Sequence, residues 1–181
     1  MKITSTLSFL ILLFTFGCQN SPKSSNGVVI LEEKPTKENR IQPEFTGNIQ
    51  KEKAASILST YLSIKDALVS GDSEKAAGEA KSLLPMVSGD TDQTLKIIYS
   101  NIKAISESDD VAQQRVHFYT LSEAVYAVMK VSKTWDIRLY KQYCPMAFNE
   151  TGAWWLSEQE EVVNPYFGDE MLHCGMVQEE F

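Results

Sequence analysis

Residues 57–69, ILSTYLSIKDALV, carry the pattern that decides the fold. The larger apolar side chains recur at spacings of four, three and four residues, which places them on one face of an α-helix. They are Ile57, Tyr61, Ile64 and Leu68. Gly71 follows the run and is a typical helix end. The segment therefore predicts an amphipathic helix that buries one apolar face.

Three further helical patterns follow, each preceded by an aspartate suited to the N-terminal cap. Asp72 opens the second pattern, while Asp90 with Gln93 and Asp110 with Gln113 resemble the capping boxes of the third and fourth. The apolar residues are Ala76, Ala77, Ala80, Leu83, Leu84 and Val87, then Leu95, Ile98, Ile102 and Ile105, then Phe118, Leu121, Val125 and either Val128 or Met129. Four amphipathic helices with short connections predict an up-and-down antiparallel four-helix bundle, and a three-helix bundle is the alternative.

The character of the sequence changes after residue 133. Trp135, Ile137 and Leu139 alternate with polar residues, as in a short strand. Residues 144–177 show no period, yet they are rich in aromatic residues and sulfur, which disordered segments lack. We therefore expect an all-α fold in which an ordered, loop-rich C-terminal cap packs on the bundle.

The first 17 residues have the pattern of a secretory signal. Lys2 supplies a positive start, residues 7–16 form an apolar run, and Gly17 stands directly before Cys18. The run is shorter than the roughly 20 apolar residues that a membrane-spanning helix needs. A small residue before a cysteine at this place resembles the lipobox of bacterial lipoproteins. The pattern predicts lipid on Cys18, with simple secretory cleavage or an uncleaved anchor as alternatives.

Charge and composition limit the partners. Residues 18–47 are polar and aperiodic, which predicts a flexible tether, and residues 48–181 then form one domain of bundle and Cys/Met-rich cap. The net charge is −7 and the basic residues are scattered, so we expect no nucleic-acid partner and membrane contact only through the lipid anchor. The motifs of common hydrolases and nucleotide-binding enzymes are missing, so no enzyme is expected.

The cap concentrates soft metal donors. Cys144 and Met146 stand in YCPMAF, and Met171 and Cys174 stand in GDEMLHCGMV. Thiolate and thioether sulfur select Cu(I), Ag(I) and related soft ions. The spacing of three between Met171 and Cys174 suits one side of a helical turn. These residues are candidate metal ligands, and His117 on the fourth helix is a further candidate.

Other interpretations of the same residues stay open. In an exported protein Cys144 and Cys174 can instead form a disulfide, which would close a loop of about 30 residues and stabilise the fold by roughly 3 to 4 kcal/mol. Methionines often fill gaps between aromatic rings. A lone histidine beside an apolar stripe, such as His117, is more often structural than a ligand.

A family resemblance rests on long stretches of the sequence. The segment LYKQYCPMAFNETGAWWLSEQEEVVNPYFGDEMLHCGMV resembles the C-terminal signature of an uncharacterised bacterial domain family, and YLSIKDALVSGDSEKAAGEAKSLL and RVHFYTLSEAVY resemble its helices. That family occurs on exported lipoproteins and at the C-terminus of membrane-fusion adaptors of copper and silver efflux pumps. The resemblance implies an all-helical domain with a heavy-metal role. Its pattern includes residues that match His117, Cys144, Met146, Met171 and Cys174.

Two functional hypotheses follow. The first is a periplasm-facing lipoprotein that binds Cu(I), or Ag(I), for sequestration or transfer in metal efflux. The second is a disulfide-stapled interaction module without metal, which presents the aromatic residues Trp154, Trp155, Tyr166 and Phe167 to an efflux adaptor or another envelope protein.

Overall fold

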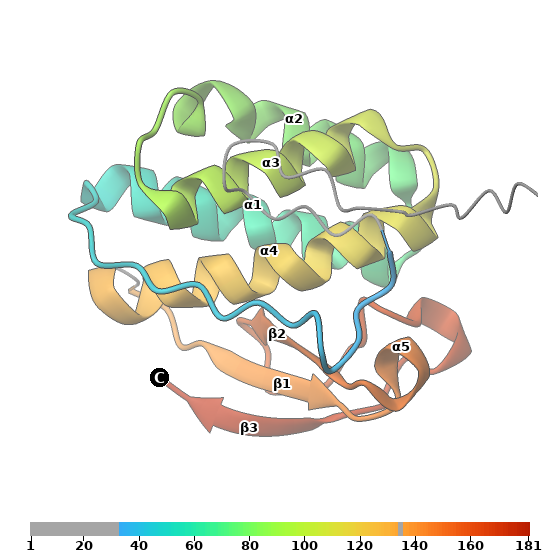
Figure 1. Ribbon diagram of the computed structural model, residues 1–181. Helices are drawn as coiled ribbons and strands as arrows, with labels where there is room; N and C mark the ends of the chain where they lie inside the picture. Colours follow the sequence, from blue (N-terminus) through green and yellow to red (C-terminus); the bar gives the residue numbers. More distant parts are fainter. Residues whose placement is uncertain (1–32, 134–135) are drawn as a thin grey trace, which may run out of the picture.

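Four α-helices form the larger layer of the protein (Figure 1). They are α1 (Lys51–Val69), α2 (Ser73–Val87), α3 (Gln93–Glu107) and α4 (Val111–Ser132). The computed structural model describes residues 33–133 and 136–181, so the predicted signal segment and Cys18 lie outside the described residues. Each helix packs on its neighbour in sequence, and α4 also packs on α1. The predicted helical bundle is confirmed.

Aspartate caps set the starts of two helices as predicted. The carboxylate of Asp72 accepts a hydrogen bond from the Lys75 backbone N–H at 2.9 Å, and Asp110 accepts one from Ala112 at 2.8 Å. Each bond satisfies an amide of the first turn that has no partner within the helix. Pro85 is accommodated inside the last turn of α2, which ends two residues later.

The start of α3 differs from the prediction. Asp92, not Asp90, caps this helix, because its Oδ1 accepts hydrogen bonds from Thr94 N–H at 2.8 Å and Leu95 N–H at 3.1 Å. Asp90 instead pairs with Lys53, and Nζ and Oδ2 lie 2.6 Å apart. Asp90 and Asp92 both stand just before this helix, so the sequence alone does not decide which of them caps it. The structure assigns Asp92 to the cap and Asp90 to a link with α1.

The all-α prediction is wrong in the cap. Three strands, β1 (Tyr140–Cys144), β2 (Ala153–Ser157) and β3 (Met176–Glu180), form an antiparallel sheet in the order β2-β1-β3. Short turns α5 (Ala147–Glu150) and η1 (Gly168–Glu170) connect them. Alternation does not reveal β2, because both its faces are buried, nor β3, because every residue of this edge strand is exposed. The predicted strand near residue 137 is displaced to residues 140–144.

Residues 33–47, hereafter the strap, lie against the domain although they were expected to belong to a flexible tether. Figure 1 shows the strap, in blue and cyan, running across α4. Phe45 is buried, Arg40 Nε donates a hydrogen bond to the Tyr119 hydroxyl at 2.7 Å, and Thr94 Oγ1 donates to the Glu44 carbonyl at 3.0 Å. These contacts fix the strap against α3 and α4. Among the described residues, no helix is long and apolar enough to cross a membrane.

One buried hydroxyl joins the bundle to the sheet. The Leu156 N–H of β2 donates to the Tyr61 hydroxyl of α1 at 2.9 Å. Ser122 of α4 donates its own proton to the Phe118 carbonyl, so it accepts one from Tyr61 at 2.9 Å. The Tyr61 ring stacks on Phe118 with centroids 4.9 Å apart. Burial raises the pKa of Tyr61, so this hydroxyl keeps its proton at any physiological pH.

We predict that Tyr61→Phe lowers the free energy of unfolding by about 1–3 kcal/mol, because a buried amide and a buried hydroxyl lose their partner. Urea unfolding followed by circular dichroism measures the change. Tyr99→Phe, at a half-buried position on α3, is the matched control. Equal stability of the Tyr61 and Tyr99 variants would contradict the role assigned to this hydroxyl.

Candidate functional site

Two cysteines that are 30 residues apart in sequence meet at one end of the sheet. Cys144 is the last residue of β1 and is completely buried, whereas Cys174 lies in the turn before β3 and is half-buried. Their Sγ atoms are 2.7 Å apart, and no disulfide bond joins them in the structure. The pair is therefore reached from the side of Cys174.

The Asn164 side chain brings Cys174 to this position. Asn164 is completely buried, and its Nδ2 donates a hydrogen bond to the Cys174 carbonyl at 2.8 Å. Its Oδ1 accepts hydrogen bonds from the backbone N–H groups of Tyr166 at 2.8 Å and Phe167 at 3.3 Å. Its own N–H donates to the Leu172 carbonyl at 2.7 Å. One amide thus closes the loop from residue 164 to residue 174.

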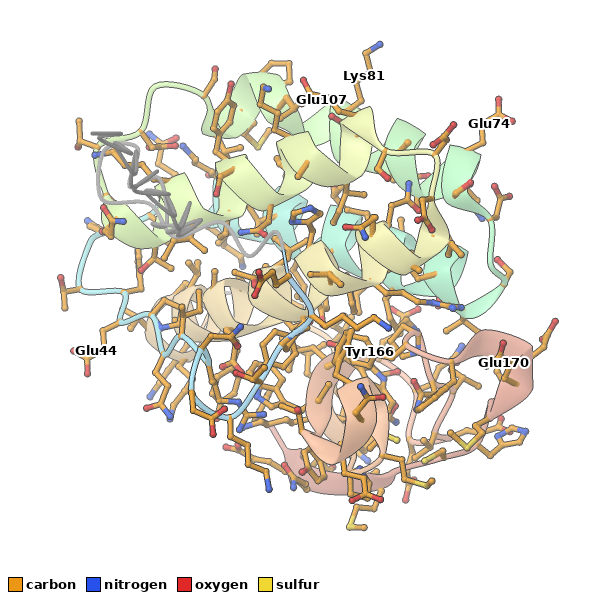
Figure 2. The ribbon with its side chains drawn as sticks, turned by 45° about the vertical axis from the view of Figure 1, so that its right-hand side comes forward. Glu44, Glu74, Lys81, Glu107, Tyr166 and Glu170 are labelled. Atoms are coloured by element: carbon orange, nitrogen blue, oxygen red, sulfur yellow. The ribbon has the colours of Figure 1, made fainter. Side chains whose placement is uncertain are left out.

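The same loop is fixed to the bundle. Arg115 Nε on α4 donates to the Pro165 carbonyl at 2.8 Å, and its Nη2 donates to the Leu68 carbonyl of α1 at 3.1 Å. The Tyr166 hydroxyl donates to the Trp154 carbonyl of β2 at 3.0 Å. Figure 2 shows Tyr166 at the junction of the helices with the cap. The position of Cys174 consequently depends on the bundle as well as on the sheet.

Gly175 allows the chain to pass close to β1 after the cysteine. Its φ is 147°, and a Cβ built there would lie 2.9 Å from the Tyr143 carbonyl oxygen. Any side chain at this position would push Met176 out of its pairing with Tyr143 and move Cys174 with it. The glycine after the second cysteine is therefore part of the site's construction.

The thiol of Cys174 holds its proton firmly. Burial raises its pKa to about 11, the neighbouring Cys144 thiol adds to the rise, and the Met146 backbone partly opposes it. Because the thiolate is the reactive form, a raised pKa slows oxidation of this cysteine. A metal ion that binds here must displace the proton.

The other predicted ligands lie at different distances from the pair. Met146 follows Cys144 by two residues, and its side chain is half exposed. The Met171 carbonyl accepts the Cys174 N–H at 3.0 Å, so Met171 is anchored one turn away. Within residues 33–133 and 136–181 no group of three or more His, Cys, Asp or Glu side chains is placed to hold a metal. His117, buried in α4, thus does not complete a cluster with the two cysteines.

Several residues that build the site escaped the sequence analysis. Asn164 and Arg115 carry no periodic signal, and a polar residue before a proline indicates only a turn. Asn164 opens NPYFG, a part of the segment that carries the family resemblance, and its side chain holds the loop that ends at Cys174. His173, the residue before Cys174, is exposed, and its Nδ1 lies 2.9 Å from the Val162 carbonyl oxygen.

Comparison with known proteins finds a match in the helical part of the chain. A family model described as "Protein of unknown function (DUF3347)" matches residues 57–136, from α1 to just beyond α4. This match supports the expectation of an uncharacterised domain family. No curated protein and no solved structure matches the chain.

We predict that Asn164→Ala lowers the free energy of unfolding by about 3 kcal/mol, because one buried and two partly buried backbone groups lose their hydrogen bonds. Cys174 should then react faster with a thiol reagent such as DTNB, since its carbonyl is no longer held. Gln159→Ala, at an exposed position, is the control. An Asn164→Ala variant with unchanged stability and unchanged Cys174 reactivity would refute this role.

Proposed function

We propose that the protein is an exported lipoprotein that binds a soft monovalent metal, Cu(I) or Ag(I), through Cys144 and Cys174. The observation that carries the proposal is the meeting of two free thiols from distant parts of the chain, with sulfurs 2.7 Å apart. Paired thiolates are the preferred ligands of these ions. The proposed role is sequestration or transfer of the metal in efflux.

Metal binding requires a small opening of the pair. With metal–sulfur bonds of about 2.3 Å, two thiolates on one ion lie roughly 4 Å apart in trigonal geometry and roughly 4.6 Å apart in linear geometry. Cys144 is fixed in β1, so Cys174 is the cysteine that must move. Its place in a turn, half-buried, allows rotation of its side chain without breaking the sheet.

Met146 is the best-placed third donor. Its backbone already contacts the Cys174 thiol, and its exposed thioether can turn toward an ion that approaches from solvent. Two thiolates and one thioether give a soft trigonal shell. Met171 is the next candidate, because its carbonyl is bonded to Cys174.

The cellular setting of the proposal comes from the sequence. The apolar run before Cys18 supports export and lipid attachment, which would anchor the domain in the cell envelope facing the periplasm. The family resemblance supports a copper or silver efflux adaptor as partner. Complete burial of Cys144 and the raised pKa of Cys174 support survival of the thiols in such an oxidising compartment.

Anaerobic titration of the full-length protein with Cu(I), against a competing chelator, tests the proposal. We expect one ion per chain, and at least a hundredfold loss of affinity in Cys144→Ser and in Cys174→Ser. Met86→Leu, at an exposed position on α2, should bind as the wild type does. Absence of binding, or binding that tolerates both serine variants, would reject the metal site.

Affinity for Cu(I) should rise with pH. The pKa of Cys174 is raised to about 11, so this thiol is protonated throughout pH 6–8 and its proton must leave on binding. Its release alone makes the apparent affinity increase about tenfold per pH unit. Competition titrations at pH 6, 7 and 8 measure the slope, and a flat profile would exclude Cys174 as a ligand.

A second candidate function is a disulfide-stapled interaction module. The short separation of the sulfurs favours it, because a disulfide brings them to about 2.05 Å. The expected aromatic platform is wrong, however, since Trp154, Trp155 and Tyr166 are buried in the core and Phe167 is only partly exposed. Mass spectrometry of the unreduced protein distinguishes the candidates, because a disulfide removes two hydrogen atoms from the mass.

A further inference from the structure

A hollow lies on the side of the protein where the strap crosses α4 and the sheet. It encloses about 830 Å³ between the strap, α4 and strands β1 and β2, and we call it the strap groove. Its lining includes Lys141 of β1, Trp154 of β2, Lys130 of α4 and Arg40 of the strap. Neither cysteine of the candidate metal site lines it.

The strap groove is positive on a negative protein. Its cations are Arg40, Lys130 and Lys141, whereas the whole chain carries a net charge of −7. The carboxylates that line it are Glu44 and Glu123. Glu123 lies nearest to Arg40, with Oε1 and Nε 3.7 Å apart, and Figure 2 shows Glu44 at the outer edge of the protein. Glu179 does not line the groove, but it accepts a hydrogen bond from the Tyr126 hydroxyl at 2.8 Å and acts on Lys141.

Two aromatic rings hold the Lys141 side chain in place. Lys141 Nζ lies 4.4 Å from the centroid of the Tyr126 ring and 4.6 Å from that of Trp154. Lys130 Nζ lies 5.3 Å from the same Tyr126 ring. Burial, and next the charges of Lys130 and Arg40, lower the pKa of Lys141, while Glu179 and Glu123 oppose this. Both lysines therefore lie against the Tyr126 ring, and the charges of Lys130 and Arg40 disfavour the charged form of Lys141. An anion bound beside them would reduce this repulsion.

Glu123 adds a buried group whose charge can change. Its Oε1 has no hydrogen-bond partner among the described residues and lies 3.7 Å from Arg40 Nε. Burial raises the pKa of Glu123 to about 7, against the effects of Arg40, Lys141 and a hydrogen bond from Trp154. The other titratable groups around it are the phenols of Tyr61, Tyr119, Tyr126 and Tyr166. When Glu123 is neutral, the three cations of the groove outnumber the carboxylates that remain charged, which are Glu44 on its lining and Glu179 beside Tyr126.

We propose that the strap groove binds a small organic anion, whose carboxylate or phosphate lies between Lys141, Lys130 and Arg40. Ammonium and guanidinium groups recognise both kinds of oxyanion. The half-buried Ala127 and exposed Val131 of α4 offer an apolar wall for the body of such a ligand. This site would work independently of the cysteine pair.

Calorimetric titration of the full-length protein with benzoate, inorganic phosphate and phenyl phosphate tests the proposal. We expect at least one of these probes to bind with a dissociation constant of about 1 mM or tighter. Benzoate as the tightest probe assigns a carboxylate ligand, and phenyl phosphate tighter than phosphate assigns an organic phosphate. Lys130→Gln and Lys141→Gln should each weaken binding about tenfold, since each removes a charge contact.

Two controls make the test decisive. Lys81→Gln changes an exposed lysine on the outer side of α2, which Figure 2 shows far from Tyr166 and the sheet, and it should leave binding unchanged. Benzoate keeps its charge above pH 6, so its binding should be about tenfold tighter at pH 6 than at pH 8 as Glu123 becomes neutral. Glu123→Gln should bind tightly at both values. Failure of all three probes to bind, or equal losses in the Lys81 and Lys141 variants, would overturn the proposal.

Discussion

The geometry of the cap depends on the buried amide of Asn164. Its Nδ2 and Oδ1 hold three backbone groups of the loop that ends at Cys174. A buried amide of this kind is stabilising only when its hydrogen bonds are made, so the loop has one low-energy arrangement. That arrangement places the Cys174 thiol against Cys144, whose position is set independently by the sheet.

The helical layer was predictable because its information is local. Periods of three and four residues and acidic caps at Asp72 and Asp110 identify helices without knowledge of their neighbours. The sheet was not predictable in this way. Strand β2, against which α4 packs, is buried on both faces, so its AWWLS sequence shows no alternation. Its identity as a strand is a consequence of tertiary packing.

The sequence indicated which kinds of residue form the candidate site, but it did not indicate which of them lie together. Sulfur-rich composition, together with the family resemblance, singled out Cys144 and Cys174, which the structure brings together. His117 was chosen from its place on a helix, and it does not form a metal-holding group with them among the described residues. Which residues meet is decided by a closed loop whose anchors, Asn164 and Arg115, have no sequence signal of their own.

The partly buried position of Cys174 has two opposing consequences for a metal site. Its raised pKa slows oxidation of the thiol, and it also makes the proton harder to remove. Only an ion with high affinity for sulfur can overcome that cost. X-ray absorption at the copper edge of the full-length protein loaded with Cu(I) tests this account most directly. It predicts a first shell of two or three sulfur atoms, and a shell of nitrogen and oxygen alone would contradict it.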